Sequence, residues 1–331
     1  MAEGARMQVP CDWHGPLLAE LMEQAERERL PHALLLAGPA GTGKARLARA
    51  LLEGLLCQSP RGGLACGQCQ ACHLSVAGSH PDLALVMPDE GKKAIRIDQV
   101  RELIEFFSRT AQFGGRRVAL LAPAEAMNRA AQNALLKTLE EPGQGAFLLL
   151  LSDQPSRLLA TVRSRCQQRL LPAPETERAL TWLVEQGCRP ERAGALLAAA
   201  GGAPLRALAL DQADWFAERD VLLGQFLAVV EGRAPASLAA QTLLRHEGLP
   251  WLAALPGWLA AALRGDGADD RLAPVLERLQ QRLGARRLLL LATEAQRARQ
   301  LLQSGANPNP QLLVERLLLV AAGVDAMAGA F

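Results

Sequence analysis

A glycine-rich turn directly after an apolar run constrains the fold of this chain more than any other feature. Residues 33–37 (ALLLA) predict a buried strand, and residues 38–44 (GPAGTGK) then lead into a helix-forming segment. In such a turn the glycines bring backbone N–H groups close to phosphate oxygens, and the following helix directs its positive end at them. The sequence therefore predicts a phosphate-binding loop whose cofactor-contacting residues are Gly38, Gly41, Thr42, Gly43 and Lys44.

The surroundings of this loop lack residues that phosphoryl transfer requires. Ala45 follows the lysine, at the position where a Ser or Thr hydroxyl would hold Mg²⁺. The strand predicted at Val118–Leu121 ends in Ala122-Pro123, where a nucleotide hydrolase carries acidic residues, and the nearest acid is Glu125. We therefore expect weak or absent binding of ATP or ADP, and no hydrolysis by this chain.

Four cysteines follow the loop with the spacing of a metal site. Cys57, Cys66, Cys69 and Cys72 form a C-x8-C-x2-C-x2-C pattern. Thiolates this close in sequence can share one ion, and four of them complete the closed tetrahedral shell of a structural zinc site. The pattern predicts Zn²⁺ in a structural role; four unrelated buried thiols are the alternative interpretation.

Bulk composition narrows the class of protein. The chain has 331 residues, enough for two or three domains, and its net charge of +2 does not indicate a general polyanion binder. The first residues lack the apolar core of a secretory signal. The longest apolar run, Leu249–Leu263, contains two prolines and is shorter than a membrane span. We expect a cytoplasmic chain without membrane contact.

Strands and helices alternate up to Pro174, which predicts a parallel sheet with helices on both faces. Further strands are expected at Pro81–Met87, Ile95–Ile97 and Ala146–Leu151, and helices at Asn128–Glu141 and from Gln99 onward, the latter capped by Asp98. After Pro174 only helical patterns occur. They are expected at residues 175–186, 192–199, 205–210, 221–230, 238–245, 257–263, 273–283, 288–303 and 311–322.

Taken together, these segments resemble the AAA+ subunits of bacterial sliding-clamp loaders. The similarity covers about the first half of the chain and rests on the GPAGTGK loop, the four cysteines, HisProAsp at 80–82, IleAspGlnValArg at 97–101, AsnAlaLeuLeuLysThrLeuGluGluPro at 133–142 and SerArgCys at 164–166. The resemblance implies an AAA+ P-loop domain over residues 1–172 with a zinc module at 57–72. It also implies a helical lid over 173–210 and a helical collar for oligomerisation over 211–331.

Within that family, the chain lacks the magnesium ligands of the ATP-hydrolysing gamma/tau type. In this respect it resembles the non-hydrolysing delta-prime type. The resemblance then implies a DNA polymerase III clamp-loader subunit that assembles with delta and gamma/tau. Through that complex it would help to load the sliding clamp onto primed DNA in DNA replication. A gamma/tau-like ATPase motor is the alternative within the family.

An autonomous nucleic-acid-binding zinc protein is the alternative outside the family. It is disfavoured because the cysteine segment has few basic residues and the chain has no Tyr for base stacking. Contact with DNA inside a ring would fall to Lys92, Lys93, Arg116 or Arg117, although such charges are more often solvated surface.

The resemblance also assigns roles to arginines. Arg165 of the SerArgCys motif would be an arginine finger that reaches a neighbouring subunit's ATP, since a guanidinium spreads its charge over several planar donors. Arg163 is the competing candidate, and an ordinary surface salt bridge is the alternative role for Arg165. Arg206 lies where the family's lid carries an arginine towards the nucleotide, but the motif around it is altered.

Overall fold

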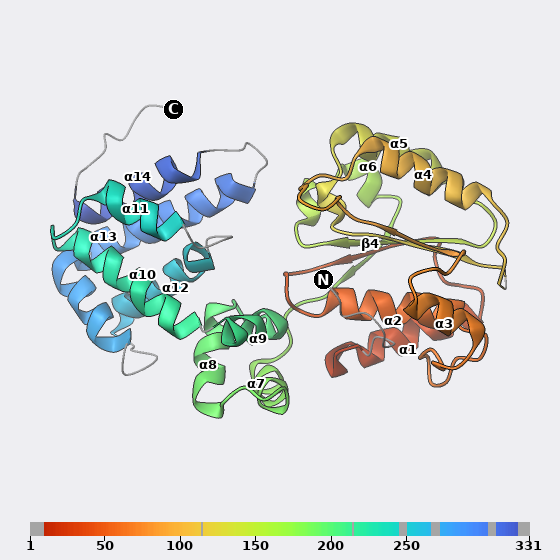
Figure 1. Ribbon diagram of the computed structural model, residues 1–331, viewed down its shortest axis with the longest axis horizontal. Helices are drawn as coiled ribbons and strands as arrows, with labels where there is room; N and C mark the ends of the chain where they lie inside the picture. The colour runs from red at the N-terminus through yellow and green to blue at the C-terminus, as the bar shows by residue number, and fades with distance from the viewer. Residues whose placement is uncertain are drawn as a thin grey trace. The chain divides into compact units, whose positions relative to one another are not determined.

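The computed structural model describes residues 10–113, 115–213, 215–244, 250–265, 272–303 and 309–323 (Figure 1). The chain forms two compact units, residues 1–174 and residues 175–331. The boundary between them lies close to the one predicted after residue 172. The further division near residue 210, into a lid and a collar, stays a prediction.

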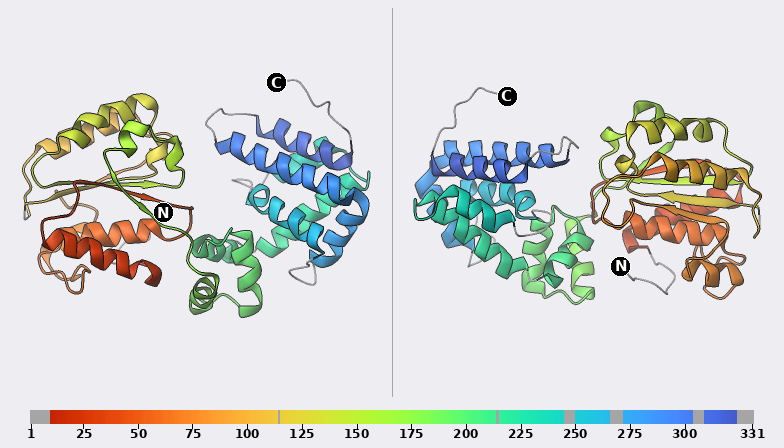
Figure 2. Two further views of the ribbon diagram at one scale, coloured as in Figure 1. Left: turned by 180° about the vertical axis from the view of Figure 1, so that it is seen from behind. Right: turned by 45° about the horizontal axis from the view of Figure 1, so that its top comes forward.

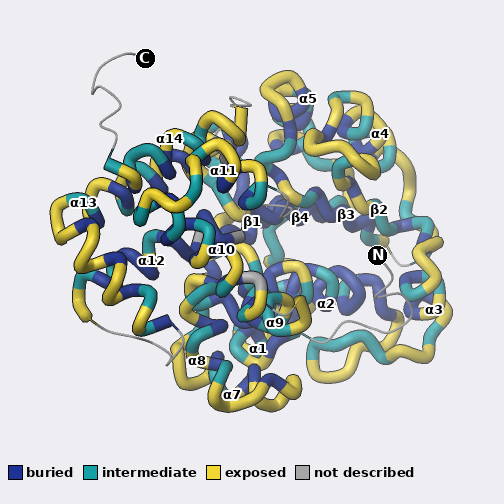
Figure 3. The backbone as a smooth tube through the Cα atoms, turned by 60° about the vertical axis from the view of Figure 1, so that its left-hand side comes forward, coloured by how far each residue is buried: buried dark blue, intermediate teal, exposed yellow. Residues whose placement is uncertain are grey.

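The first unit contains one parallel sheet of five strands in the order β2-β3-β4-β1-β5. The strands are β1 (Ala33–Ala37), β2 (Leu83–Val86), β3 (Arg117–Leu121), β4 (Ala146–Ser152) and β5 (Gln167–Leu170). Strands β1 and β3 are buried along their whole length, as is β4 after its first residue (Figure 3). Parallel strands covered on both faces read as continuous apolar runs, which is why the sequence predicted them.

Helices cover both faces of this sheet (Figures 1 and 2). On one face lie α1 (Gly15–Glu26), α2 (Lys44–Leu56) and α3 (Gln70–Val76), and on the other lie α4 (Ile97–Ser108), α5 (Arg129–Glu140) and α6 (Ala160–Arg163). Alternate residues of β1 serve the two cores: Leu34 and Leu36 pack in the cluster with α1 and α2, whereas Leu35 packs with α4 and α5. Short 3-10 turns at Asp12–His14, Ala124–Ala126 and Pro155–Arg157 complete the unit.

Two local predictions in this unit are wrong, and one strand escaped prediction. Ile95–Ile97 is no strand: Ile95 forms a single isolated bridge to Met127, and α4 already begins at Ile97. The cap of α4 is Arg96 instead of Asp98, since the Gln99 side chain accepts the Arg96 backbone N–H at 2.9 Å. Strand β5 was not predicted, because its sequence QQRL is polar and exposed at the sheet edge.

The described part of the second unit is helical throughout. Its helices are α7 (Thr176–Glu185), α8 (Pro190–Ala199), α9 (Pro204–Gln212), α10 (Trp215–Val230), α11 (Ala236–Leu244), α12 (Pro250–Arg264), α13 (Leu272–Gln303) and α14 (Pro310–Ala322). Helix α13 joins the two helices predicted at 273–283 and 288–303, which meet at a kink where Gly284 has φ 65°. Helix α12 begins seven residues before its predicted start and carries Pro256 inside it.

None of the described helices alone combines the length and apolarity that crossing a bilayer requires. One bent pair, α8 with α9, has the length and composition for it, with a bend of 114° between the two helices.

Candidate functional site

The predicted phosphate loop lies between β1 and α2, at the carboxyl edge of the sheet. Gly41 and Gly43 have φ of 79° and 92°, a left-handed backbone that glycine adopts without strain. Gly38 has no room for a side chain, because a Cβ there would lie 2.0 Å from the Leu171 carbonyl oxygen. Helix α2 begins at Lys44, so its first backbone N–H groups are directed at the loop. The backbone therefore keeps the form of an anion-binding turn.

Lys44 is engaged within its own surroundings. Its Nζ donates to the carbonyl oxygens of Gly38 at 2.7 Å and Pro39 at 2.6 Å, and it lies 2.6 Å from Asp153 Oδ1. An ammonium group has three N–H donors, and here three acceptors surround it. The lysine side chain is 6% exposed. Asp153 directly follows β4 and was not anticipated from the sequence.

The turn before α1 packs over the loop. Trp13 Nε1 donates to the Thr42 carbonyl oxygen at 2.9 Å, and Thr42 Oγ1 donates to the Pro39 carbonyl oxygen at 3.0 Å. A Cβ on Gly43 would lie 2.7 Å from Cys11 Sγ. His14 is buried beside Gly43, and burial together with the Lys44 charge lowers its pKa to about 4, so that the ring is neutral at pH 7.

Glu125, the first acid in sequence after β3, holds a backbone turn. Its Oε1 accepts the backbone N–H groups of Asp153 at 3.0 Å and Gln154 at 3.2 Å, and so fixes the turn that carries Asp153. A magnesium–nucleotide complex fits these residues poorly. Ala45 offers no hydroxyl, Lys44 has its donors engaged, and Glu125 holds a backbone turn.

Arg165 is the central residue of the SerArgCys segment and lies just after α6. Its side chain forms an ion pair with Glu140 of α5. Its Nε and Nη2 lie 2.7 and 2.5 Å from Glu140 Oε1, and its Nη1 donates to the Thr161 carbonyl oxygen at 3.0 Å. The side chain is 35% exposed. The neighbouring Arg163 differs, because its Nε is buried without a hydrogen-bond partner among the described residues.

Arg206 lies on α9 in the second unit. Burial and the nearby Arg299 lower the pKa of its guanidinium. Its suggested contact with a nucleotide stays a prediction.

The four cysteines of the predicted metal site converge. Cys57 ends α2, Cys72 lies in α3, and Cys66 and Cys69 lie between them. Their sulfur atoms are 3.4 to 4.0 Å apart in four of the pairs, and all lie within 4.8 Å of one another. A tetrahedral ion with Zn–S bonds near 2.3 Å requires sulfur–sulfur distances of about 3.8 Å. The cluster can therefore hold one metal ion in a tetrahedral sulfur shell.

Backbone N–H groups point at these sulfurs. Cys57 Sγ accepts from the N–H groups of Cys66 at 3.2 Å and Ser59 at 3.4 Å. Backbone hydrogen bonds from Gln68 and Cys69 lower the pKa of Cys66 to about 6, which favours its thiolate. Such donors around a sulfur shell orient the ligands and stabilise the charge that a metal requires.

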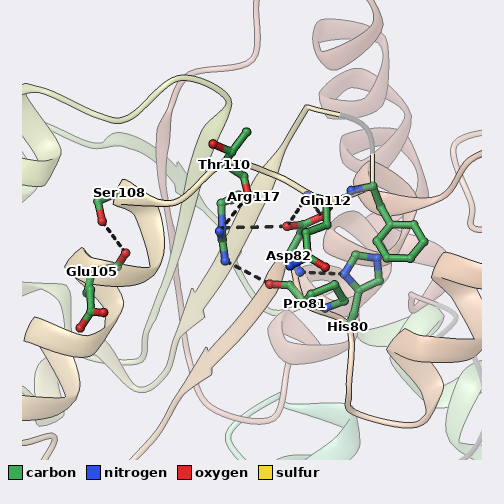
Figure 4. Close-up of polar contacts among 9 residues, drawn as sticks. His80, Pro81, Asp82, Glu105, Ser108, Thr110, Gln112 and Arg117 are labelled. Carbon is green, nitrogen blue, oxygen red and sulfur yellow. Dashed lines mark hydrogen bonds and ion pairs between the residues drawn. The ribbon is translucent and has the colours of Figure 1, made fainter.

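The HisProAsp segment forms a buried polar network at the opposite, amino edge of the sheet (Figure 4). Asp82 accepts the backbone N–H groups of Gln112 and Phe113 at 2.8 to 3.0 Å. Arg117 Nε lies 4.0 Å from Asp82 Oδ1. The same guanidinium donates to two backbone carbonyl oxygens and stacks over the Phe106 ring. Because Arg117 is 6% exposed, the suggested DNA contact through this residue is wrong.

Fold and loop define the class of protein: a parallel α/β unit with a glycine-rich phosphate-type loop after its first strand, followed by a helical unit. Residues 13–175 match the family model described as "DNA polymerase III, delta subunit", and residues 213–322 match "DNA polymerase III, delta subunit, C terminal". The chain is 40% identical to DNA polymerase III subunit delta' of Pseudomonas aeruginosa over 318 residues, which covers 93% of this chain and 95% of the relative. It is 36% identical to the same subunit of Escherichia coli K12, with 93% of each chain covered. The chain belongs to the family of DNA polymerase III delta-prime subunits.

Two further matches are more limited. DNA polymerase III subunit tau of Escherichia coli is 34% identical over 150 residues, which covers 45% of this chain but 23% of tau. A solved structure described as a DNA polymerase III gamma subunit-related protein of Thermotoga maritima covers 94% of this chain at 17% identity, with a TM-score of 0.42.

Proposed function

We propose that this chain is the non-hydrolysing delta-prime subunit of a DNA polymerase III clamp loader. In this role it assembles with the delta and gamma/tau subunits in the cytoplasm and helps to place the sliding clamp on primed DNA. Its near full-length similarity to delta-prime subunits is the observation that carries the proposal. The loop supports it, because Ala45 has no metal-binding hydroxyl and Lys44 is engaged by Asp153 and two loop carbonyls.

Arg165 is proposed as the arginine finger that acts on a neighbouring subunit's ATP. Its contacts support a defined orientation: Glu140 and the Thr161 carbonyl oxygen take three of the five guanidinium N–H groups. Nη1 and Nη2 each keep one further N–H group, and a guanidinium that is 35% exposed can offer such donors to phosphoryl oxygens of a partner. The proposed role is therefore catalytic in trans, and this chain has no proposed reaction of its own.

The metal in the cysteine cluster is proposed to be Zn²⁺. Four thiolates in a tetrahedral arrangement form a closed shell, which suits a structural ion and leaves no position for substrate. The ion would fasten the segment between α2 and α3.

Reconstituted clamp loading tests the proposed function. Fluorescent sliding clamp, primed DNA and ATP are mixed with delta and gamma/tau, with or without this chain, and clamp retained on DNA is measured. We expect loading to require this chain, while the same mixture without gamma/tau gives no loading. Equal loading with and without the chain would contradict the proposal.

A further inference from the structure

An acidic side chain lies against the lysine of the phosphate loop. Parallel pairing of β1 with β4 sets Ala37 opposite Ser152, and the Gly38 N–H donates to the Ser152 carbonyl oxygen at 3.1 Å. The register therefore brings the residue after Ser152 directly beside the loop. That residue is Asp153, and its Oδ1 lies 2.6 Å from Lys44 Nζ.

Hydrogen bonds to the Glu125 side chain also fix the backbone at Asp153. Glu125 Oε1 accepts the N–H groups of Asp153 and Gln154, so the turn after β4 is held at two consecutive backbone donors. The Asp153 side chain is 42% exposed, whereas the lysine side chain that it contacts is 6% exposed. The carboxylate thus contacts a buried ammonium group while remaining partly open to solvent.

We infer that Asp153 is an internal anion that takes the place of a nucleotide phosphate on Lys44 and keeps this loop closed to nucleotides. Two effects act in the same direction. A phosphate oxygen must displace the carboxylate from an ammonium whose three donors are already engaged, and it must also approach a fixed negative charge.

The rest of the turn retains the features that bind phosphate. Gly41 and Gly43 hold the left-handed backbone of the turn, and α2 begins at Lys44, so that the positive end of the helix faces the loop. Removing the negative charge of Asp153 should therefore uncover a phosphate site that needs no magnesium ligand.

Binding of ADP to the full chain, in EDTA and at low salt, tests the inference by titration calorimetry. We expect Asp153→Asn, which keeps the shape and removes the charge, to bind ADP at least about tenfold more tightly than the unchanged chain. Inorganic pyrophosphate should show the same gain, because the gain comes from the phosphates. Adding Lys44→Ala to Asp153→Asn should abolish it.

A matched control is available at Asp89, an acid 45% exposed that pairs with Arg96 at 2.9 Å away from the loop. Asp89→Asn removes the same charge and should leave ADP binding unchanged. Asp153→Ser provides a second variant, should the amide disturb the turn, and circular dichroism verifies that each variant is folded. If both folded Asp153 variants bind ADP no more tightly than the unchanged chain, or if Asp89→Asn gives an equal gain, the inference is wrong.

Discussion

Asp82 joins separate parts of the first unit through one buried carboxylate. It is fully buried and accepts backbone N–H groups of Gln112 and Phe113, with Arg117 beside it (Figure 4). An amide at this position would set an NH₂ group against donors and remove the negative charge beside Arg117. We expect Asp82→Asn to lower the free energy of unfolding by about 3 kcal/mol, measured as a lower urea midpoint at an unchanged slope.

Asp98 provides the comparison for this substitution. It is 65% exposed and pairs with Arg101, 67% exposed, at 3.2 Å on the surface of α4. Asp98→Asn should cost less than about 0.5 kcal/mol, since solvent screens such pairs. Equal losses for the two substitutions would mean that the buried network does not stabilise the fold.

His14 makes the stability of the first unit depend on pH. Its pKa is about 4 in the folded chain against an ordinary value of 6.5, because burial and Lys44 disfavour the charged ring. Between these two values the unfolded chain binds more protons, so the contribution of the neutral ring is complete above pH 6.5 and is lost as the pH falls towards 4. We expect this loss to lower the free energy of unfolding by about 3 kcal/mol.

Urea unfolding of the chain and of His14→Gln, measured from pH 7 to pH 4.5, tests this effect. The variant should lose less stability on acidification, although His80, whose pKa is also lowered by burial, leaves it some dependence on pH. If the free energy of unfolding falls equally with pH in both proteins, His14 does not cause the pH dependence.

Single residues also show where sequence reasoning stops. The loop at residues 38–44 could be predicted because its residues are adjacent in sequence. Its glycines and its lysine each have a known role in a phosphate-binding turn. Asp153 could not be predicted, since only the β1–β4 register brings it to Lys44. The same holds for Glu140 beside Arg165, and for Trp13 and His14 above the loop.

At the scale of elements, the cysteine cluster joins the end of α2 to α3. A metal in this shell should add folding energy locally, because its ligands lie on separate segments. We expect about one equivalent of zinc in the purified chain, and less than half of that after Cys69→Ser. Chelation should speed hydrogen exchange in α3 while β1 and β4 stay protected.

Cys188 serves as the control, since it lies in the second unit, away from the cluster in sequence. Cys188→Ser should retain the full zinc content. Metal content unaffected by Cys69→Ser would contradict the assignment of these four ligands.

Helices α5 and α6 together position Arg165. If Glu140 fixes the guanidinium, Glu140→Gln should lower the ATPase rate of the reconstituted loader less than Arg165→Ala does, because the charge remains but its orientation is looser. Removing a finger costs about 10³–10⁵-fold in related systems. Circular dichroism and co-elution with delta and gamma/tau should be unchanged for both variants, and loss of co-elution would show a structural role instead.

Elements were predictable where burial is two-sided or a helical face is broad. The strands at 33–37, 118–121 and 146–151 were found from continuous apolar runs, and the structure confirms them. Strand β5 has no such run, because it lies at the sheet edge with polar side chains. Helix α12 was predicted too short, since Pro256 suggested a break that the structure accommodates inside the helix.

At the scale of the whole molecule, an α/β unit precedes a helical unit, as the shift of pattern after Pro174 predicted. Neither unit as described supplies a complete site for ATP hydrolysis. We therefore propose, as the central claim, that this chain contributes to an ATPase and does not hydrolyse ATP itself.

Steady-state ATP hydrolysis tests that claim most directly. The rate is measured for the isolated chain and for a mixture with delta, gamma/tau, sliding clamp and primed DNA, each with unchanged chain or with Arg165→Ala. We predict no turnover by the isolated chain, stimulated turnover in the mixture, and loss of that stimulation with Arg165→Ala. Turnover by the isolated chain that disappears with Lys44→Ala would contradict the account and identify a motor subunit.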